Sequence, residues 1–180
     1  MNYVQPIRDL DKLDAIKKYL RLRNLRDWML FVAGINSGLR ISDLLLLRVE
    51  DVGGKHIVLK ETKTRKRKWI RIVPKLRRAF DSYTPDMNDR DFLFRSREGG
   101  NKPISRARAY QVLREAARVH GLDHIGTHTM RKTFGYHFYQ QYKDVALLQR
   151  IFNHANQSVT LRYIGIDQDA MDQAMSKFGL

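Results

Sequence analysis

Hydrophobic periodicity constrains this chain most, because nearly all of it repeats with the spacing of α-helices and one stretch does not. Over most of its length, apolar residues recur every three or four positions, as in helices with one buried face. Residues 56–59 and 69–73 are instead rich in β-branched and aromatic side chains, which favours two strands. The sequence therefore predicts an α+β fold that is mainly helical and contains a small antiparallel sheet. The expected helices run from a cap at Asp9 to Leu22, from Asn24 to Gly38, from Ser42 to Leu47, from Pro74 to Tyr83, from Ser105 to His120, from His128 to Tyr142, from Asp144 to Phe152, from Ser158 through Tyr163, and from Asp167 to Phe178.

The size and charge of the chain bound its domain number and its partners. With 180 residues, it is expected to form one domain. Lysine and arginine number 34 and aspartate and glutamate 19, which gives a formal net charge of +15. Such a charge destabilises the compact state by self-repulsion unless a polyanion neutralises it. We therefore expect a nucleic acid as the partner, with an anionic membrane surface as the second choice.

Several classes of protein are excluded by features that the sequence lacks. It contains no cysteine, which rules out disulfide frameworks, thiolate chemistry and sulfur-ligated zinc sites. Residues 1–10 lack the apolar core that a signal peptide needs, and no run of about 18 apolar residues occurs, so we expect a cytoplasmic protein that does not span a membrane. No phosphate-binding loop or His-Glu-x-x-His motif occurs, and Asp167 and Asp169 open a predicted helix, where acidic residues suit the helix dipole. We expect neither a metal nor another cofactor.

Phosphoryl transfer without a metal needs a particular set of side chains. Arginines must stabilise the charge on the non-bridging oxygens, a second group must protonate the leaving oxygen, and a nucleophile must attack. Arg40 is one candidate, because it lies between a helix that Gly38 ends and a helix that Ser42 begins. His128 and Arg131 are three residues apart and share one face of a helix. Taken singly, each is explained more simply as an ordinary surface or helix-start residue.

His154, Tyr163 and Lys63 complete the candidates. His154 lies between an apolar helix and a polar turn, Tyr163 lies in a short predicted helix, and Lys63 lies near the tip of the connection between the two strands. Residues 60–71 hold seven basic residues and one acidic residue, Glu61. A grip on the DNA backbone explains this segment at least as well as catalysis does. The expected DNA contacts are Lys60, Arg65, Lys66, Arg67, Lys68, Arg95, Arg97, Lys102, Arg106 and Arg108.

The order of the six candidates carries more information than any one of them. They occur in the order and rough spacing of the tyrosine recombinase, or phage integrase, family. The most specific pieces are SGLRISDLLLL at residues 37–47, THTMRKTF at residues 127–134, and FNH at residues 152–154, followed nine residues after the histidine by Tyr163. The sequence resembles the catalytic domain of that family over nearly its whole length. The resemblance implies the DNA breaking-rejoining fold and the activity of a site-specific DNA recombinase or integrase.

The resemblance also implies how the scissile phosphate is bound. Arg40 and Arg131 would clamp the phosphate, because a planar guanidinium can bind two of its oxygens. His128 and His154 would hydrogen-bond those oxygens. Asp43 would lie near Arg40 and orient it.

By the same resemblance, Tyr163 would attack the phosphate and His128 would accept its proton. The product would be a 3′-phosphotyrosyl link, and Lys63 would protonate the departing 5′ oxygen. Because this link conserves the bond energy, rejoining would need neither ATP nor a metal.

The chain departs from the family pattern in places. Where the family usually has Leu-Gly-His, residues 152–154 are Phe-Asn-His, and Asn153 tolerates the left-handed backbone that glycine would serve. Met130 replaces a leucine, which is a conservative change in a core. Family members usually carry N-terminal core-binding and arm-binding domains. We expect residues 1–180 to form a single catalytic domain without them.

The predicted C-terminal helix has an apolar face with no obvious partner in the chain. Its members are Ala170, Met171, Ala174, Met175 and Phe178. The resemblance implies that this helix packs onto a neighbouring protomer and couples the sites of a homo-oligomer, a tetramer on double-stranded DNA. Folding back onto its own core is the alternative.

Two further functions are compatible with the same residues. One is relaxation of supercoiled DNA by a monomer, as in type IB topoisomerases. The other is a non-catalytic DNA-binding protein that keeps the fold. An RNA-binding protein is less expected, because no RNA-recognition signature occurs. In each DNA-acting case we expect a bacterial or phage protein that associates with the nucleoid in the cytoplasm.

Overall fold

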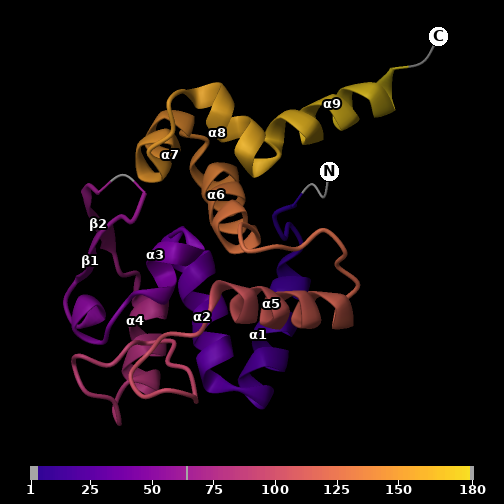
Figure 1. Ribbon diagram of the computed structural model, residues 1–180. Coiled ribbons are helices and arrows are strands. Elements are labelled where there is room, and N and C mark those ends of the chain that lie inside the picture. Colours follow the sequence, from indigo (N-terminus) through magenta and orange to yellow (C-terminus); the bar gives the residue numbers. More distant parts are fainter. Residues whose placement is uncertain (1–3, 64, 179–180) are drawn as a thin grey trace.

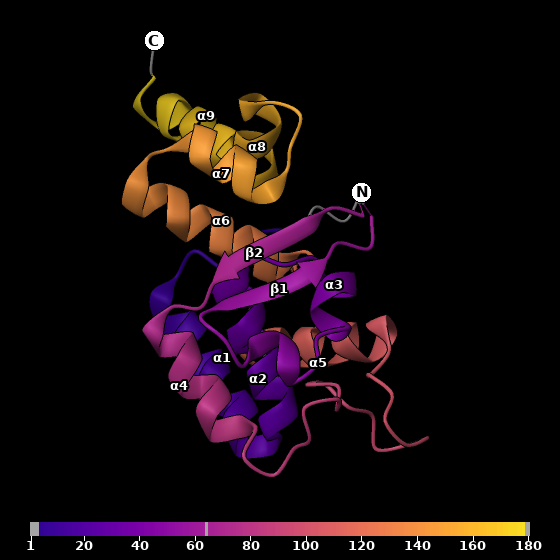
Figure 2. The ribbon, with the colours of Figure 1, turned by 90° about the vertical axis from the view of Figure 1, so that its left-hand side faces the viewer.

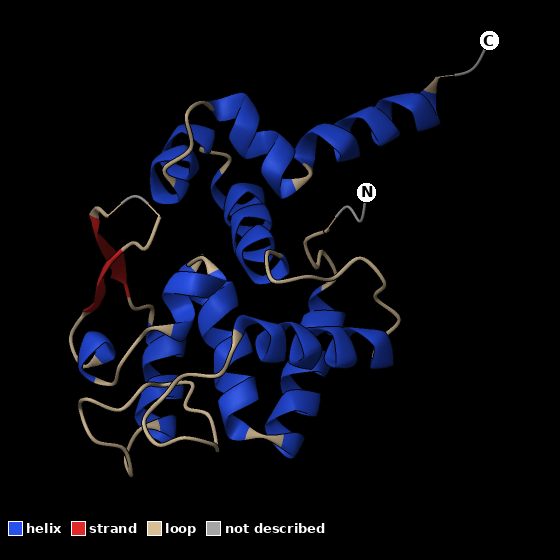
Figure 3. Ribbon diagram, viewed as in Figure 1, coloured by secondary structure: helices blue, strands red, loops and turns tan. Residues whose placement is uncertain are grey.

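The computed structural model describes residues 4–63 and 65–178, and this part of the chain forms helices beside one two-stranded sheet (Figures 1 and 3). The predicted class, mainly helical with a small antiparallel sheet, is confirmed. Within these residues, no helix has both the length and the apolar character needed to cross a bilayer. The elements are α1 (Leu10–Arg23), α2 (Leu25–Ser37), α3 (Ile41–Leu45), the 3-10 helix η1 (Glu50–Val52), β1 (His56–Lys60), β2 (Arg67–Arg71), α4 (Pro74–Tyr83), α5 (Arg106–Val119), α6 (Thr129–Tyr142), α7 (Val145–Phe152), α8 (Gln157–Ile164) and α9 (Ile166–Lys177).

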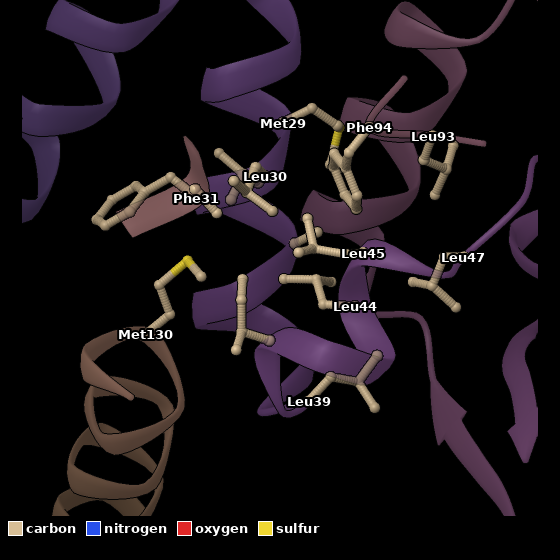
Figure 4. Packing of buried hydrophobic residues seen from close by; sticks show 14 of the residues in the cluster. Met29, Leu30, Phe31, Leu39, Leu44, Leu45, Leu47, Leu93, Phe94 and Met130 are labelled. Carbon is tan, nitrogen blue, oxygen red and sulfur yellow. The ribbon is translucent and has the colours of Figure 1, made fainter. Parts of the chain in front are cut away.

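The main hydrophobic core surrounds α2, which packs against α1, α4 and α6. Leu30 of α2 is fully buried and belongs to the same apolar cluster as Leu44 of α3 and Met130 of α6 (Figure 4). Gly34 lets α6 come this close, because a Cβ at this position would lie 2.4 Å from the Met130 sulfur. This packing fixes the first turn of α6 against the end of α2.

A smaller apolar cluster joins α6, α7 and α8. Its fully buried members are Leu148, Phe152 and Ile164, with Phe134 packed against them. Gly135 of α6 permits the close approach, because an added Cβ would lie 2.7 Å from both Ile164 and Phe152. The ends of α7 and α8 are therefore held rigidly beside α6.

The hairpin of β1 and β2 lies beside α3 (Figures 1 and 2), and Lys68 of β2 contacts the end of α7. Leu59 pairs with Lys68 across the antiparallel ladder, and Ile57 pairs with Ile70. β2 begins two residues earlier than expected, because residues 67 and 68 continue the ladder opposite the end of β1. The backbone N–H of Glu61 donates to the carbonyl of residue 66 at 2.9 Å and closes the turn.

Two helices begin earlier than their predicted caps. Arg40 rather than Ser42 is the N-cap of α3, because the carbonyl of Arg40 already accepts from two backbone amides of the first turn. Asn156 rather than Ser158 caps α8, and its side chain accepts from the backbone N–H of Val159 at 2.9 Å. The caps at Asp9, Asn24, Ser105 and Asp144 are confirmed.

The C-terminal helix α9 extends away from the body (Figure 1) and has no buried residue. Arg8, in the segment before α1, donates two hydrogen bonds of 2.7 and 3.1 Å to the Asp169 carboxylate at the base of α9. Met171, Met175 and Phe178 are 54%, 68% and 65% exposed. The expected apolar face therefore does not fold back onto the core of its own chain.

Candidate active site

Arg131 is the central cation of a polar cluster where α6 meets the α2–α3 junction and the end of α7. Its side chain is 3% exposed, and Nη1 donates to the carbonyl of Gly38 while Nη2 donates to that of Phe152 at 2.8 Å. Gly38 is left-handed at φ 62°, and the ring of Phe134 occupies the place of a Cβ there. Burial lowers the pKa of Arg131 to about 10, so the guanidinium stays cationic at neutral pH.

Arg40 faces the same cluster from the start of α3. Its Nη1 donates to Oε1 of Glu61 at 2.8 Å. Arg131 donates to the carbonyl of Gly38, two residues before Arg40, so both side chains belong to the α2–α3 junction. Burial lowers the pKa of Arg131, and the charge of Arg40 adds to this lowering. Asp43, expected to orient Arg40, instead accepts a 2.8 Å bond from the backbone N–H of Thr62, because its helix turn directs it to the hairpin. Its other carboxylate oxygen has no partner among the described residues.

His128 and Tyr163 lie at hydrogen-bond distance, although 35 residues separate them. His128 is the N-cap residue of α6, and its Nδ1 is 3.3 Å from the hydroxyl oxygen of Tyr163 on α8. Burial raises the pKa of Tyr163, and the charge of Arg131 opposes that shift. Burial, followed by the charge of Arg106, lowers the pKa of His128. A neutral imidazole is therefore placed to accept the phenol's proton.

His154 closes the cluster after the end of α7. Its ring centroid is 5.1 Å from that of Tyr163, and its Nδ1 is 3.1 Å from the Thr160 hydroxyl. Asn153 ends α7 in the left-handed conformation at φ 56°, so the backbone predicted for this asparagine is confirmed. Burial, reinforced by the charges of Arg131 and Arg40, lowers the pKa of His154 to about 4.

The hairpin contributes two lysines in different settings. Lys63 is exposed on the turn, near the predicted tip. Lys68 is among the expected DNA contacts, but its side chain is only 15% exposed. Its Nζ donates to the carbonyl of Ile151 at 2.6 Å and lies 3.4 Å from Oε1 of Glu61. Burial, followed by the charge of Arg131, lowers the pKa of Lys68.

The other expected DNA contacts lie on the surface. Arg95 also forms a 3.3 Å ion pair with Asp91. Contact of these residues with DNA stays a prediction. The exposed members are Lys60, Arg65, Lys66, Arg67, Arg95, Arg97, Lys102, Arg106 and Arg108.

Comparison with known proteins identifies the family of this chain. The sequence model of the phage integrase family matches residues 9–169. A relative from Bacillus subtilis (strain 168), named probable integrase/recombinase YoeC, is 53% identical over 180 residues, with 99% of each chain covered. The chain belongs to the phage integrase family. The predicted family and enzyme class, a tyrosine-type site-specific recombinase, are confirmed, and the relatives do not favour the alternative functions.

More distant members of the phage integrase family show how much of a longer protein this chain matches. Tyrosine recombinase XerA of Pyrococcus horikoshii is 25% identical over 169 residues, which are 91% of this chain and 59% of XerA. The crystal structure of a XerA recombinase has a TM-score of 0.76 at 18% identity, covering 98% of this chain and 65% of that one. XerH bound to its palindromic difH substrate has a TM-score of 0.72 at 18% identity, with 98% and 54% covered. These two structures confirm the fold. The chain spans nearly all of YoeC and little more than half of the Xer recombinases.

Sequence reasoning missed Glu61 and misplaced Lys68. The period of two in a strand could have found them, because residues 57, 59 and 61 share one face of the hairpin and residue 68 lies opposite residue 59. Ile57 is buried, so its face turns inward, and Glu61 follows it to 3% exposure. Because most residues of this segment are basic, the alternation between inward and outward side chains is not evident from the sequence.

Proposed function

We propose that this recombinase breaks and rejoins duplex DNA with Tyr163 as the nucleophile. The observation that carries the proposal is the hydroxyl of Tyr163 at 3.3 Å from His128, in a cluster that also contains Arg131 and Arg40. A phenol with a raised pKa must lose its proton to a base before it can attack phosphorus, and the neutral imidazole of His128 can accept that proton. The arginines supply the positive charge that a phosphodiester and its transition state require.

The cleavage step follows from this placement. The hydroxyl oxygen of Tyr163 attacks phosphorus as its proton passes to His128, and a bond between phosphorus and the tyrosine oxygen forms. The bond from phosphorus to the 5′ oxygen breaks, and Lys63 gives that oxygen a proton. The products are a 3′-phosphotyrosyl link and a free 5′ hydroxyl. Attack by another 5′ hydroxyl reverses the step, which needs neither ATP nor a metal.

The two arginines and His154 would bind the non-bridging oxygens of the phosphate. Arg131 uses one bond from each terminal nitrogen to hold itself in place, which fixes its plane before DNA arrives. Charges that are already in place before the reaction stabilise the transition state without a cost of reorganisation. An anionic phosphate favours the charged form of His154, whose pKa is low while the protein is alone.

Binding of double-stranded DNA would rest on the exposed arginines and lysines of the hairpin, the loop before α5 and the first turn of α5. Phosphate contacts of this kind supply affinity without sequence information. Residues 1–180 would act as one catalytic unit. The protein would work on the nucleoid, in the cytoplasm of a bacterium or of a phage host.

Trapping the covalent intermediate tests the proposed chemistry. Duplex fragments from the genomic surroundings of the gene, nicked so that the freed 5′ end is lost, should accumulate a denaturation-resistant adduct. Tyr163→Phe should form no adduct and still bind DNA. Tyr19→Phe, on a tyrosine of α1 outside the candidate site, whose hydroxyl lies 3.3 Å from Oε1 of Glu115, is the matched control and should react as the wild type does. An adduct formed by Tyr163→Phe would contradict the assignment. DNA binding without an adduct from the wild type would favour the non-catalytic alternative.

We further propose that α9 docks on a second copy and builds a tetramer on DNA. An apolar groove of about 1180 Å³ lies between β2, α6 and α7, lined among others by Trp69, Tyr142 and Leu147. Trp69 and Tyr142 are 64% and 58% exposed, so the groove lacks a cover. Basic residues border it and acidic residues begin α9, which gives complementary charge.

Sedimentation of the protein on DNA tests this docking. Met175→Asp on α9 and Trp69→Ala in the groove should each reduce tetramers to smaller complexes, because each removes part of one apolar contact. Leu22→Asp is the control, since Leu22 is 90% exposed at the end of α1. Full assembly by both variants would exclude this interface.

A further inference from the structure

Glu61 is a buried carboxylate within a cluster of cations, and no step of the proposed reaction uses it. It is 3% exposed. Its Oε1 accepts from Nη1 of Arg40 at 2.8 Å and lies 3.4 Å from Nζ of Lys68. A charge is this deeply buried only where its partners offset the loss of water.

The fold places Glu61 by two independent constraints. It directly follows β1, on the same face as the buried Ile57, so the side chain turns toward the body. Its backbone closes the turn of the hairpin, because its N–H donates to the carbonyl of residue 66 and its carbonyl accepts from the N–H of Arg65, both at 2.9 Å. The position of the carboxylate is therefore fixed before it meets Arg40.

The two arginines of the site differ in what holds them. Backbone carbonyls of Gly38 and Phe152 hold Arg131. For Arg40, the side-chain acceptor within the described residues is Glu61 alone. Only Nη1 of Arg40 takes part in this bond, which leaves the rest of the guanidinium for a phosphate.

We propose that Glu61 is a positioning residue, which orients Arg40 for the scissile phosphate and balances the charges of Arg40 and Lys68. This inference rests on the proposed function of the site. Without the carboxylate, Arg40, Lys68 and Arg131 would repel one another at short range in a poorly solvated site. The charge of Glu61 raises the pKa values of Lys68 and Arg131, against the lowering by burial, so it acts on each of these cations.

Glu61 also links Arg40 to the predicted proton donor. Lys63 is two residues further along the chain, on the turn that Glu61 closes. A bond from Glu61 to Arg40 therefore sets the distance between the group that binds the phosphate and the segment that would protonate the leaving oxygen. Misplacement of such groups by about 1 Å can cost about 100-fold in rate.

The rate of adduct formation on the nicked substrate tests the inference. Glu61→Gln keeps the shape and removes the charge, and we expect a rate about 10- to 100-fold lower with DNA affinity unchanged or higher. Glu61→Asp keeps the charge and should recover part of the loss. Glu50→Gln, on an exposed residue of η1, makes the same change of net charge and should keep the wild-type rate.

A double-mutant cycle separates positioning from a general effect on folding. If Glu61 acts through Arg40, Glu61→Gln should change the rate much less in an Arg40→Ala background than in the wild type. Equal losses in both backgrounds would overturn the inference, as would a wild-type rate for Glu61→Gln. Thermal unfolding of each variant shows whether it folds. Absence of an adduct from the wild type would refute the proposed function instead, so the two failures are distinguishable.

Discussion

The two sides of the candidate site are held by different forces, and the difference shows which changes each side tolerates. On one side, α6, α7 and α8 carry His128, Arg131, His154 and Tyr163. These helices meet around Phe152, which is fully buried. Aromatic packing fixes this side, and the ring of Phe152 contacts both Tyr163 at 5.6 Å and Arg131 at 4.1 Å between centres.

On the other side, the hairpin carries Glu61, Lys63 and Lys68. It reaches the rest of the site through Glu61 to Arg40 and through Lys68 to the carbonyl of Ile151. Charged hydrogen bonds hold this contact at the site. Apolar packing holds the hairpin further from its turn, where Ile57 is buried in the main core. Changes on the packed side should therefore cost both stability and activity, whereas changes on the hairpin side should cost mainly activity.

Arg131→Ala should give the largest effect, because Arg131 both binds the phosphate and ties α6 to two other segments. We expect adduct formation to fall about 1,000-fold. The free energy of unfolding should fall by about 3 kcal/mol, since two buried carbonyls lose their donor. Urea denaturation and adduct kinetics measure the two effects.

Arg78→Ala, on an exposed arginine of α4, is the control and should change stability by less than about 0.5 kcal/mol. Unchanged stability in Arg131→Ala would contradict the expectation that changes on the packed side also cost stability.

Gly135→Val should break the packed side without touching a charged group. Its Cβ would lie 2.7 Å from Ile164 and Phe152, both fully buried, so the helices must move apart. We expect a loss of about 3 kcal/mol in the free energy of unfolding. Activity should fall with it, because Tyr163 is on one of the displaced helices. Gly53→Ala, where the nearest contact would be 3.8 Å, is the control and should keep both. A stable, active Gly135→Val would mean that this packing does not position the nucleophile.

The packed side was the more predictable of the two from sequence. The helices with strong caps, such as those at Asp9 and Asn24, were predicted because a cap and an apolar period are local properties. The convergence of Arg40 with Arg131 came from resemblance in the order of residues, since no local pattern brings positions 91 apart in sequence together. In the structure, Arg131 donates to the carbonyl of Gly38, two residues before Arg40, which brings the two positions to one junction.

The hairpin side was predicted less well, for a physical reason. Sequence periodicity shows which residues alternate, but strands of 5 residues give few repeats. Among many cations, nothing local distinguishes Lys68, which points inward, from Lys66, which is exposed. The inward position of Lys68 depends on its contacts with Glu61, which is 7 residues away across the hairpin, and with the carbonyl of Ile151, which is 83 residues away. Likewise, Ser42 and Ser158 could each cap a helix, and only the observed hydrogen bonds show that the N-cap residues are Arg40 and Asn156.

Lys68→Met should sharpen the comparison from the hairpin side. We expect adduct formation to fall about 10-fold, because the hairpin loses its bond to the end of α7. The free energy of unfolding should change by less than about 1 kcal/mol, since removal of a partly buried cation also removes its desolvation cost.

Salt dependence distinguishes this lysine from an exposed one. Lys66→Gln should lower the slope of log affinity against log salt by about one unit, whereas Lys68→Met should leave the slope unchanged. Filter binding across a salt series measures both. A loss of one unit in Lys68→Met would place this lysine on a DNA phosphate and contradict its inward position.

The smallest expected effect is a pH dependence of stability that originates on the packed side. Burial holds the pKa of His154 at about 4 in the folded protein, below its ordinary 6.5. As the pH falls below 6.5, the unfolded chain binds a proton at this residue and the folded protein does not, so stability is present at neutral pH and is lost on acidification. Full linkage would give about 2 kcal/mol between pH 7 and pH 5. Because His154 is only half-buried and solvent screens it, we expect about 1 kcal/mol. Urea denaturation at both values should show a shallower decline for His154→Gln, whereas His124→Gln, on an exposed histidine before α6, should decline as the wild type does. Because burial is the largest cause of the shift, the same decline in His154→Gln as in the wild type would mean that this side of the site is more open to water than its packing implies.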